Sequence, residues 1–236
     1  MKNLAIIPAR GGSKRIPRKN IKDFLGKPII SYSIETAIGT NLFDEIMVST
    51  DDDEIAEIAK KYGAQIPFLR SIQTANDHAT LAEVLIETVG KYKEMGKEPE
   101  NICCILSTAP LITGDDIFKA YSMLTDFQKY DSICPIVQFS FPILRSLVMN
   151  TNGYINMKWP EYMNCRSQDL EAAYHDAGLF YWVKTEALIK YNTMLTSQTG
   201  GMVIDEAVAQ DIDTESDWKL AELKYRLLKK NPDHER

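Results

Sequence analysis

A basic, glycine-containing stretch near the start of the chain, "LAIIPARGGSKRIPRKN" (residues 4–20), has the composition of a phosphate-binding loop. An apolar run ends at Pro8, and Gly11 and Gly12 follow it. Glycines allow a ligand to approach the backbone closely, and exposed N–H groups together with cations neutralise phosphate. Because the chain as a whole has a net charge of −6, this local positive charge predicts a specific anion site rather than a solvated basic surface. The basic residues are Arg10, Lys14, Arg15, Arg18 and Lys19.

Two common phosphate-binding patterns do not fit this stretch. The P-loop requires G-x-x-x-x-G-K-[ST], whereas Gly26 and Lys27 are followed by Pro28 and no glycine stands five positions before Gly26. The Rossmann pattern G-x-G-x-x-G is also absent. Pro17 opposes a helix directly after the glycines. We therefore expect the loop to cover its ligand as an extended segment.

The elements around this loop alternate between short apolar runs and longer amphipathic segments. This alternation predicts an α/β fold with a mostly parallel sheet and helices on both faces. In such sheets ligands bind beyond the carboxyl ends of the strands, which places the site in loops 8–20, 50–52, 70–80 and 107–113. Strands are expected at 4–9, 45–50, 64–69, 101–107, 132–137 and 178–183, and helices at 28–38, 51–63, 79–95, 114–127, 185–191 and 214–230.

The alternation breaks after about residue 138. The following segment lacks helical periodicity at first and contains "NTNG", a hairpin-turn signal. We interpret the chain as a single domain over residues 1–236 with an inserted, β-rich arm at about 138–177. The tail 231–236 is expected to be frayed.

Composition and charge exclude several classes of protein. The net charge of −6 argues against a nucleic-acid partner. The first apolar run is too short for a secretory signal, and no run approaches the roughly 20 apolar residues that cross a bilayer. We therefore expect no membrane association and a cytoplasmic location. Without a CxxC motif, the cysteines are expected to be buried free thiols; they are Cys103, Cys104, Cys134 and Cys165.

Several segments resemble the acylneuraminate cytidylyltransferase family. They are "IPARGGSKRIPRKN", "VSTDDDEIAEIAKKYGA", "RSQDLE.AYHDAG.FYW" and "QDIDTESDW", and the resemblance spans nearly the whole chain. It implies a Rossmann-like nucleotidyltransferase core, a requirement for Mg²⁺ and a homodimer formed through the inserted arm. It also implies a reaction in which a hydroxyl of an acidic nine-carbon sugar attacks the α-phosphate of CTP, releasing pyrophosphate and forming a CMP-sugar.

The basic loop is expected to hold the triphosphate of CTP, because phosphoryl-type transfer depends on charge neutralisation and positioning. Donors to the triphosphate are expected from Gly11, Gly12 and Ser13. Asn20 is expected to fix the nucleotide. Arg15 and Arg18 could equally be solvent-facing charges. The cations expected to neutralise the pyrophosphate are Arg10, Lys14 and Lys19, of which the resemblance assigns catalytic roles to Arg10 and Lys19.

Other nucleotide contacts are expected from the loops after the first three strands. By resemblance Ala9 belongs to the nucleotide site and Arg70 contacts the base, while Asp77 and Thr80 close the pocket. Ser71 replaces the proline that usually follows this arginine, so the backbone there is expected to be less restrained. Asp51 lies at the ligand edge of the sheet. Asp52 and Asp53 are interpreted as acids in the first turn of a helix.

A pair of carboxylates, Asp211 and Asp213, supplies candidate Mg²⁺ ligands. In an extended segment residues two apart point to the same side, and Mg²⁺ in triphosphate enzymes is commonly held by one or two carboxylates. The alternative is helix capping by Asp213 or Thr214, since Thr214 and Asp217 fit a capping-box pattern. The resemblance favours metal binding, and a catalytic role, for both aspartates.

The sugar site is expected to include Leu106 and Thr108. Sialic-acid enzymes of the family carry a glutamine where this chain has Leu106, whose side chain cannot form hydrogen bonds. The difference favours pseudaminic acid, which is less polar, over N-acetylneuraminic acid. Arg166 could bind the sugar carboxylate through a bidentate pair. Further contacts from the arm, which in a dimer could serve the partner's site, are Gln168, Tyr174 and His175.

Two kinds of alternative stay open at this point. The same reaction could act on N-acetylneuraminic, legionaminic or 3-deoxy-manno-octulosonic acid. A catalytically silent nucleotide-binding protein would need a damaged basic loop or a damaged acid pair, and both are intact in this sequence.

Overall fold

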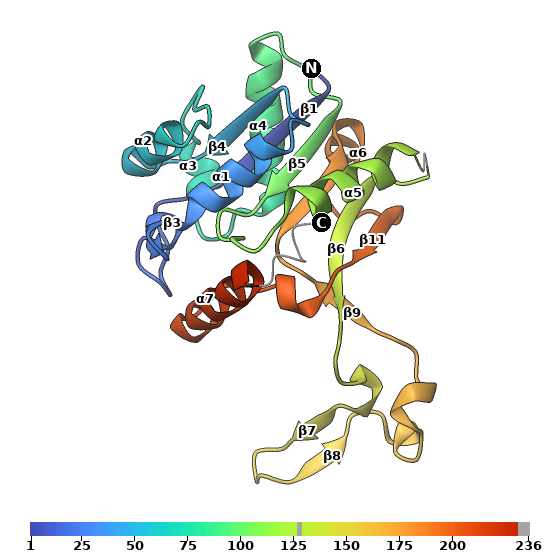
Figure 1. Cartoon of the computed structure of the whole chain (residues 1–236). Helices are drawn as coiled ribbons and strands as arrows, with labels where there is room; N and C mark the ends of the chain where they lie inside the picture. Colours follow the sequence, from blue (N-terminus) through green and yellow to red (C-terminus); the bar gives the residue numbers. More distant parts are fainter. Residues whose placement is uncertain (127–128, 231–236) are drawn as a thin grey trace.

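The centre of the molecule is a twisted sheet whose strand order is β11-β6-β10-β5-β1-β4, with β9 paired to β6. The computed structural model describes residues 1–126 and 129–230; Phe127, at the end of one expected helix, and the expected frayed tail lie outside the described residues. Figure 1 shows helices on both faces of this sheet. The strands are β1 (Asn3–Pro8), β4 (Glu45–Ser49), β5 (Asn101–Ile105), β6 (Ser132–Gln138), β9 (Tyr174–Asp176), β10 (Phe180–Lys184) and β11 (Thr199–Val203).

The sheet is mixed. Strand β1 pairs in parallel with β4 and β5, and β11 pairs in parallel with β6. Strand β10 runs antiparallel between β5 and β6, because the chain returns from the arm in the opposite direction. The prediction of a strand at 64–69 is wrong, because the segment forms only an isolated β-bridge between Gln65 and Met47. Pro67 has no N–H to continue the ladder.

The two faces of the sheet carry separate apolar cores, as expected for strands covered on both sides. Alternate residues of β1 divide between them, with Ala5 and Ile7 facing α1, α2 and α5 and with Leu4 and Ile6 facing α4 and α6. The helices are α1 (Ile29–Gly39), α2 (Asp53–Lys61), α3 (Ile72–Ala75), α4 (Leu81–Glu94), α5 (Gly114–Asp126), α6 (Thr185–Tyr191) and α7 (Glu215–Lys230).

A third, smaller core joins the basic loop to the C-terminal helix. Ile16 of the loop and Ile212, which precedes α7, are buried together with Phe24 and Trp218. Phe24 comes from a small hairpin of β2 (Asp23–Phe24) and β3 (Lys27–Pro28), and its ring packs edge-on against Trp218 at 5.6 Å. This core brings together two segments almost 200 residues apart in the sequence.

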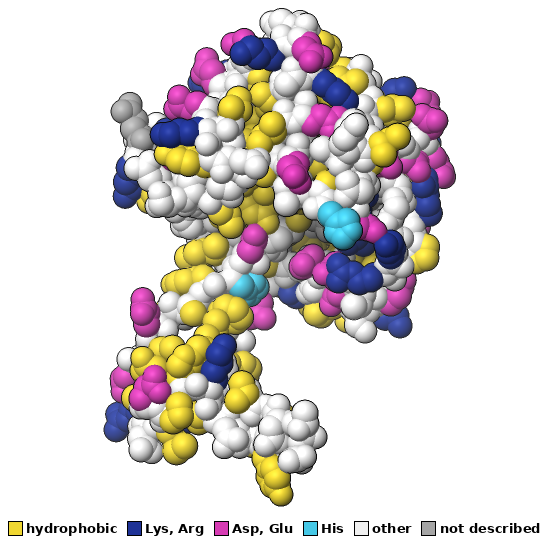
Figure 2. Space-filling model, turned by 180° about the vertical axis from the view of Figure 1, so that it is seen from behind, with side chains coloured by type: hydrophobic (Ala, Val, Ile, Leu, Met, Phe, Trp, Pro, Cys, Tyr) yellow, Lys and Arg dark blue, Asp and Glu magenta, His cyan; other side chains and the backbone are white. Residues whose placement is uncertain are grey.

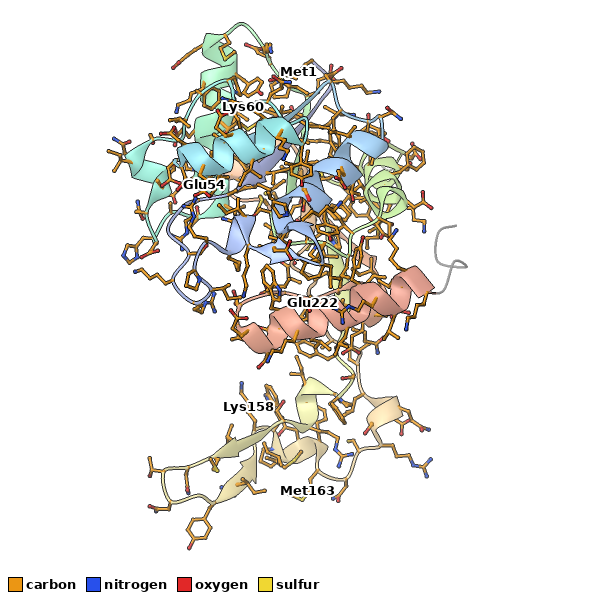
Figure 3. The ribbon with its side chains drawn as sticks, turned by 60° about the vertical axis from the view of Figure 1, so that its left-hand side comes forward. Met1, Glu54, Lys60, Lys158, Met163 and Glu222 are labelled. Carbon is orange, nitrogen blue, oxygen red and sulfur yellow. The ribbon has the colours of Figure 1, made fainter. Side chains whose placement is uncertain are left out.

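The segment between β6 and β9 projects from the body of the molecule (Figure 1). It holds a short hairpin of β7 (Leu147–Met149) and β8 (Ile155–Met157), so strands form only a small part of it. At the expected turn, the Asn150 side chain accepts hydrogen bonds from the Asn152 and Tyr154 amides. Helix α7, marked by Glu222 in Figure 3, lies on the side of the body that faces this arm. The 3₁₀ turns are η1 (Lys19–Ile21), η2 (Ile143–Arg145), η3 (Pro160–Tyr162), η4 (Ser167–Asp169) and η5 (Glu206–Val208).

No helix in the described ranges is both long and apolar enough to span a bilayer. All four cysteines are free thiols, and Cys103, Cys104 and Cys134 are buried as expected. Cys165, in the arm, is partly exposed.

Candidate active site

A pocket of about 320 Å³ opens at the carboxyl ends of β1, β4 and β5. Its walls come from the basic loop, from residues 70–84, from the loop after β5 and from Asp211. This is the edge of the sheet at which ligands bind in α/β folds. Ten of the expected site residues line it: Arg10, Ser13, Lys14, Lys19, Asn20, Arg70, Asp77, Leu106, Thr108 and Asp211.

Every cation of the basic loop is paired with a carboxylate from another part of the chain. Arg10 donates to Asp77 at 2.6 Å, and Lys14 contacts the same carboxylate. Arg15 and Lys19 both approach Asp213, at 2.6 and 3.6 Å. The cations Arg10, Lys14, Arg15 and Lys19 line the pocket, whereas Arg18 lies outside it and pairs with Asp52 and Glu54.

Asp52 has a role that the sequence analysis missed. It caps α2 by accepting a hydrogen bond from the Ile55 amide, and it also accepts two hydrogen bonds from Arg18, at 2.5 and 3.0 Å. The Arg18 guanidinium lowers the pKa of the Asp52 carboxyl to about 2, against the effect of burial. The sequence signal that could have indicated this pairing was a run of three aspartates after one strand and a basic loop after another.

The glycine at position 11 is required by this contact. A Cβ at Gly11 would lie 2.6 Å from Oδ2 of Asp52, which no real side chain tolerates. The Gly11 amide donates to Oδ1 of Asp51 at 3.0 Å. Gly12 has open space around it. The close approach of loop to carboxylates therefore depends on Gly11.

The two aspartates of the acid pair flank Ile212, and of the two Asp211 lines the pocket. Ile212 is fully buried between Asp211 and Asp213, and its carbonyl accepts a hydrogen bond from Nζ of Lys19 at 2.6 Å. Partial removal from water, then the nearby charge of Asp213, raises the pKa of the Asp211 carboxyl. Two mutually repelling carboxylates next to the cations that line the pocket form a donor set suited to Mg²⁺.

The side-chain carboxylates of Asp211 and Asp213 take no part in the capping of α7. The Thr214 hydroxyl accepts from the Asp217 amide, and the Asp217 carboxylate accepts from the Thr214 amide. Only the backbone N–H of Asp213 takes part, as a second donor to Asp217. The capping box is therefore present, and the side chain of Asp213 remains available to the loop cations.

The backbone after Arg70 is held more firmly than expected. Glu87 on α4 accepts hydrogen bonds from the Ser71 amide and the Ser71 hydroxyl, both at 2.9 Å, and from the Thr74 hydroxyl. Proline at position 71 could offer neither donor, so these hydrogen bonds supply a restraint that the sequence analysis did not foresee. The Arg70 guanidinium is buried and donates to the Ser49 hydroxyl and carbonyl. Burial lowers the pKa of the Arg70 guanidinium below its usual value.

Several expected nucleotide contacts are engaged elsewhere. Both functional groups of the Asn20 side chain form hydrogen bonds within the protein. Ala9 is buried, and its amide donates to Ser49. Thr80 forms the capping box of α4 with Glu83, away from the pocket lining.

The arm residues expected at the sugar site do not reach the pocket of their own chain. Arg166 and Gln168 are exposed around η4, and Tyr174 and His175 are exposed on β9. The His175 ring packs against Phe139 at 4.9 Å. Leu106 and Thr108 are the expected sugar contacts that line the pocket.

A second, larger hollow of about 470 Å³ lies at the opposite edge of the sheet, between α4 and α6. Lys93 in its wall pairs with Glu98 at 3.8 Å. Its lysines and glutamates are mixed, so it lacks the concentration of cations that distinguishes the pocket beside the basic loop.

Comparison with known proteins agrees with this site. The family model described as cytidylyltransferase matches residues 4–198, and the chain belongs to the cytidylyltransferase family. It is therefore a nucleotidyltransferase enzyme. Pseudaminic acid cytidylyltransferase of Campylobacter jejuni is 40% identical over 227 residues, which cover 96% of this chain and 97% of that protein.

More distant relatives extend the comparison. CMP-N,N'-diacetyllegionaminic acid synthase of Legionella pneumophila is 30% identical, with 94% of this chain and 95% of that protein covered. A CMP:2-keto-3-deoxy-manno-octonic acid synthetase solved with CTP superposes with a TM-score of 0.67 at 20% identity, covering 98% of this chain and all of that one. The expected Rossmann-like nucleotidyltransferase fold is confirmed.

The hydrogen bonds that Glu87 accepts from Ser71 and Thr74 predict that the stability of the protein depends on pH. Burial alone would raise the pKa of Glu87, but hydrogen bonds from Lys91, Thr74 and Ser71 lower it from 4.5 to about 2. A lowered pKa contributes stability above pH 4.5 that is lost as the pH falls toward 2. In Glu87→Gln we expect the free energy of unfolding to fall by about 1–2 kcal/mol at pH 7 and to depend less on pH below 5. Denaturant unfolding at a series of pH values measures both.

Glu57→Gln is the matched control, because Glu57 is exposed and pairs with Lys60 on the surface of α2. It should leave the stability nearly unchanged. If Glu57→Gln and Glu87→Gln lowered the free energy of unfolding equally, the stabilising role of Glu87 would be contradicted.

Proposed function

We propose that this enzyme transfers CMP from CTP to a nonulosonic acid, and that the acid is pseudaminic acid. The observation that carries the proposal is the near-full-length identity of 40% to pseudaminic acid cytidylyltransferase. It is combined with an intact basic loop and acid pair, of which Asp211 lines the pocket and Asp213 pairs with the pocket cations Arg15 and Lys19. Leu106 in the pocket wall supports a sugar with fewer polar groups. The free, mostly buried cysteines support a cytoplasmic location.

The pocket residues divide the chemistry between them. Arg10, Lys14 and Lys19 neutralise the triphosphate and, above all, the pyrophosphate as it leaves. Ser13 and the Gly12 amide donate hydrogen bonds to phosphate oxygens, while the Gly11 amide stays bound to Asp51. Arg70, held by Ser49, presents its remaining N–H groups toward the nucleotide. Because the transition state develops charge on phosphate oxygens, preorganised donors of this kind contribute the larger part of the rate.

Asp211 and Asp213 are proposed to hold Mg²⁺ together with the triphosphate. When bound, the ion would offset the negative charge of the phosphate groups. Within the described residues no group of three or more histidine, cysteine or acidic side chains could hold a metal by itself. This agrees with a site completed by substrate, in which the protein supplies two carboxylates.

The sugar site is proposed to be completed by a second copy of the chain. Arg166, Gln168, Tyr174 and His175 are exposed on the arm and its base. Figure 2 shows apolar side chains gathered on the arm. Exposed apolar surface of this extent on a projecting arm is typical of an interface. The exposed apolar residues there are Phe141, Leu147, Val148, Met149, Tyr154, Ile155 and Met163.

Release of pyrophosphate from CTP with a panel of acid sugars tests the function. Pseudaminic acid is expected to give the highest kcat/KM, with N-acetylneuraminic, legionaminic and 3-deoxy-manno-octulosonic acids at least about tenfold lower, since each loses or mismatches hydrogen bonds in the pocket. Preference for another acid would overturn the proposed substrate, and no release with any acid would overturn the proposed reaction.

The metal site is tested by Asp211→Asn and Asp213→Asn. Each should lower turnover at saturating CTP by about a hundredfold or more, and each should shift the Mg²⁺ titration to higher concentration. Asp205→Asn is the control, since the Asp205 side chain caps η5. Normal Mg²⁺ titration curves in both site variants would exclude these ligands.

The dimer is tested by sedimentation of the full chain. We expect the mass of two chains. In mixtures of Arg166→Ala and Lys19→Ala chains, activity should recover, because one of the two pockets in a mixed dimer receives both an intact Lys19 and the partner's intact arm. A single-chain mass, or no recovery in mixed dimers, would contradict a shared site.

A further inference from the structure

We propose that Ser107 is a positioning residue, which sets the distance between the basic loop and the loop after β5 that carries Leu106 and Thr108. The expected effect of Ser107 on kcat rests on the proposed function. Its expected effect on the order of the basic loop does not. Ser107 is almost fully buried, with 6% of its surface exposed, and none of the roles described above involves its side chain.

The side chain of Asn20 connects the two ends of the basic loop. Asn20 is also 6% exposed. Its Nδ2 donates to the Arg10 carbonyl at 2.9 Å, which joins the first and last residues of the loop. Its Oδ1 accepts a hydrogen bond from the Ser107 hydroxyl, also at 2.9 Å. Asn20 therefore acts through Arg10 and Ser107.

The bond between Ser107 and Asn20 has no substitute nearby. Over the described parts of the chain, it is the one hydrogen bond that joins residues 10–22 to residues 106–113. The neighbouring Leu106 is anchored in other directions: its amide donates to Leu179, and its carbonyl accepts from the Ser33 hydroxyl. The loop after β5 is thus attached to the sheet and α1, and Ser107 extends that attachment to the basic loop.

The two loops it joins have different tasks in the reaction. Arg10 and Lys19, which are proposed to bind the triphosphate, line the pocket together with Leu106 and Thr108, which are proposed to contact the sugar. In-line transfer requires the attacking hydroxyl and the α-phosphate to be aligned, and a displacement of about 1 Å can lower the rate about a hundredfold. Loss of the Ser107 hydroxyl would also leave a buried amide oxygen without its partner, which favours a shift of the loop.

The test compares Ser107→Ala with Ser107→Thr, which keeps a hydroxyl, and with Ser31→Ala. Ser31 is a fully buried serine of α1 whose hydroxyl donates to the Pro28 carbonyl, away from the pocket. In Ser107→Ala we expect kcat to fall about tenfold or more while KM for CTP changes by less than about threefold, because the phosphate contacts within the loop remain. Ser107→Thr should restore kcat to within about threefold of the wild type, and Ser31→Ala should leave kcat unchanged.

Amide hydrogen exchange of residues 10–22 in the ligand-free full chain gives a second readout. It should be faster in Ser107→Ala than in the wild type and unchanged in Ser31→Ala. A double-mutant cycle with Asn20→Ala should show that removing Ser107 has no further effect on kcat once Asn20 is absent. Wild-type kcat in Ser107→Ala, or independent effects in the cycle, would overturn the positioning role.

Failure of the proposed function remains distinguishable from failure of this inference. If the wild type transfers CMP to none of the acid sugars, the reaction is wrong, and hydrogen exchange alone decides the role of Ser107. Unchanged exchange in Ser107→Ala would then reject it, and faster exchange would support it.

Discussion

Repulsion among five cations within ten residues is the constraint on which the site depends. Such a loop cannot stay ordered beside a pocket unless opposite charges lie close to it. The protein supplies them from three separate segments, at Asp52 and Glu54, at Asp77, and at Asp213. Arg18 is held outside the pocket by its carboxylates, whereas the pairs of Arg10, Lys14, Arg15 and Lys19 face it. If the triphosphate binds as proposed, Asp77 and Asp213 would release these cations to it, while Arg18 and Gly11 keep the loop attached to Asp52 and Asp51.

The rest of the fold serves this arrangement. The carboxyl ends of β1 and β4 place the loop opposite Asp51 and Asp52. The small core around Ile16, Ile212 and Trp218 brings the C-terminal acid pair to the same pocket. Glu87 and Lys91 on α4 fix the segment that carries Arg70. Each of these attachments uses residues outside the pocket to place a residue that lines it. Substitutions outside the pocket can therefore alter the geometry of the site.

Much of this could be predicted from the sequence, because the decisive patterns are local. Apolar runs alternating with amphipathic segments predicted the α/β core, and the glycines and cations after the first strand predicted a pocket at that end of the sheet. Long-range pairings could not be predicted in the same way. No local pattern in the sequence shows that Arg18 pairs with Asp52, that Glu87 holds Ser71, or that Asn20 accepts a hydrogen bond from Ser107. The direction of β10 was also beyond local patterns, since it follows from the path of the arm.

The most direct measurement of the central claim compares pyrophosphate release by Lys19→Ala and Lys22→Ala. Lys19 lies in the pocket beside Asp213, whereas Lys22 pairs with Glu215 and lies over the Trp218 ring outside it. If the loop acts as a preorganised counter-charge for the leaving pyrophosphate, Lys19→Ala lowers kcat by about a hundredfold or more with an unchanged unfolding temperature, and Lys22→Ala keeps near-normal turnover. Normal turnover in Lys19→Ala, or equal losses in the two variants, would contradict the account.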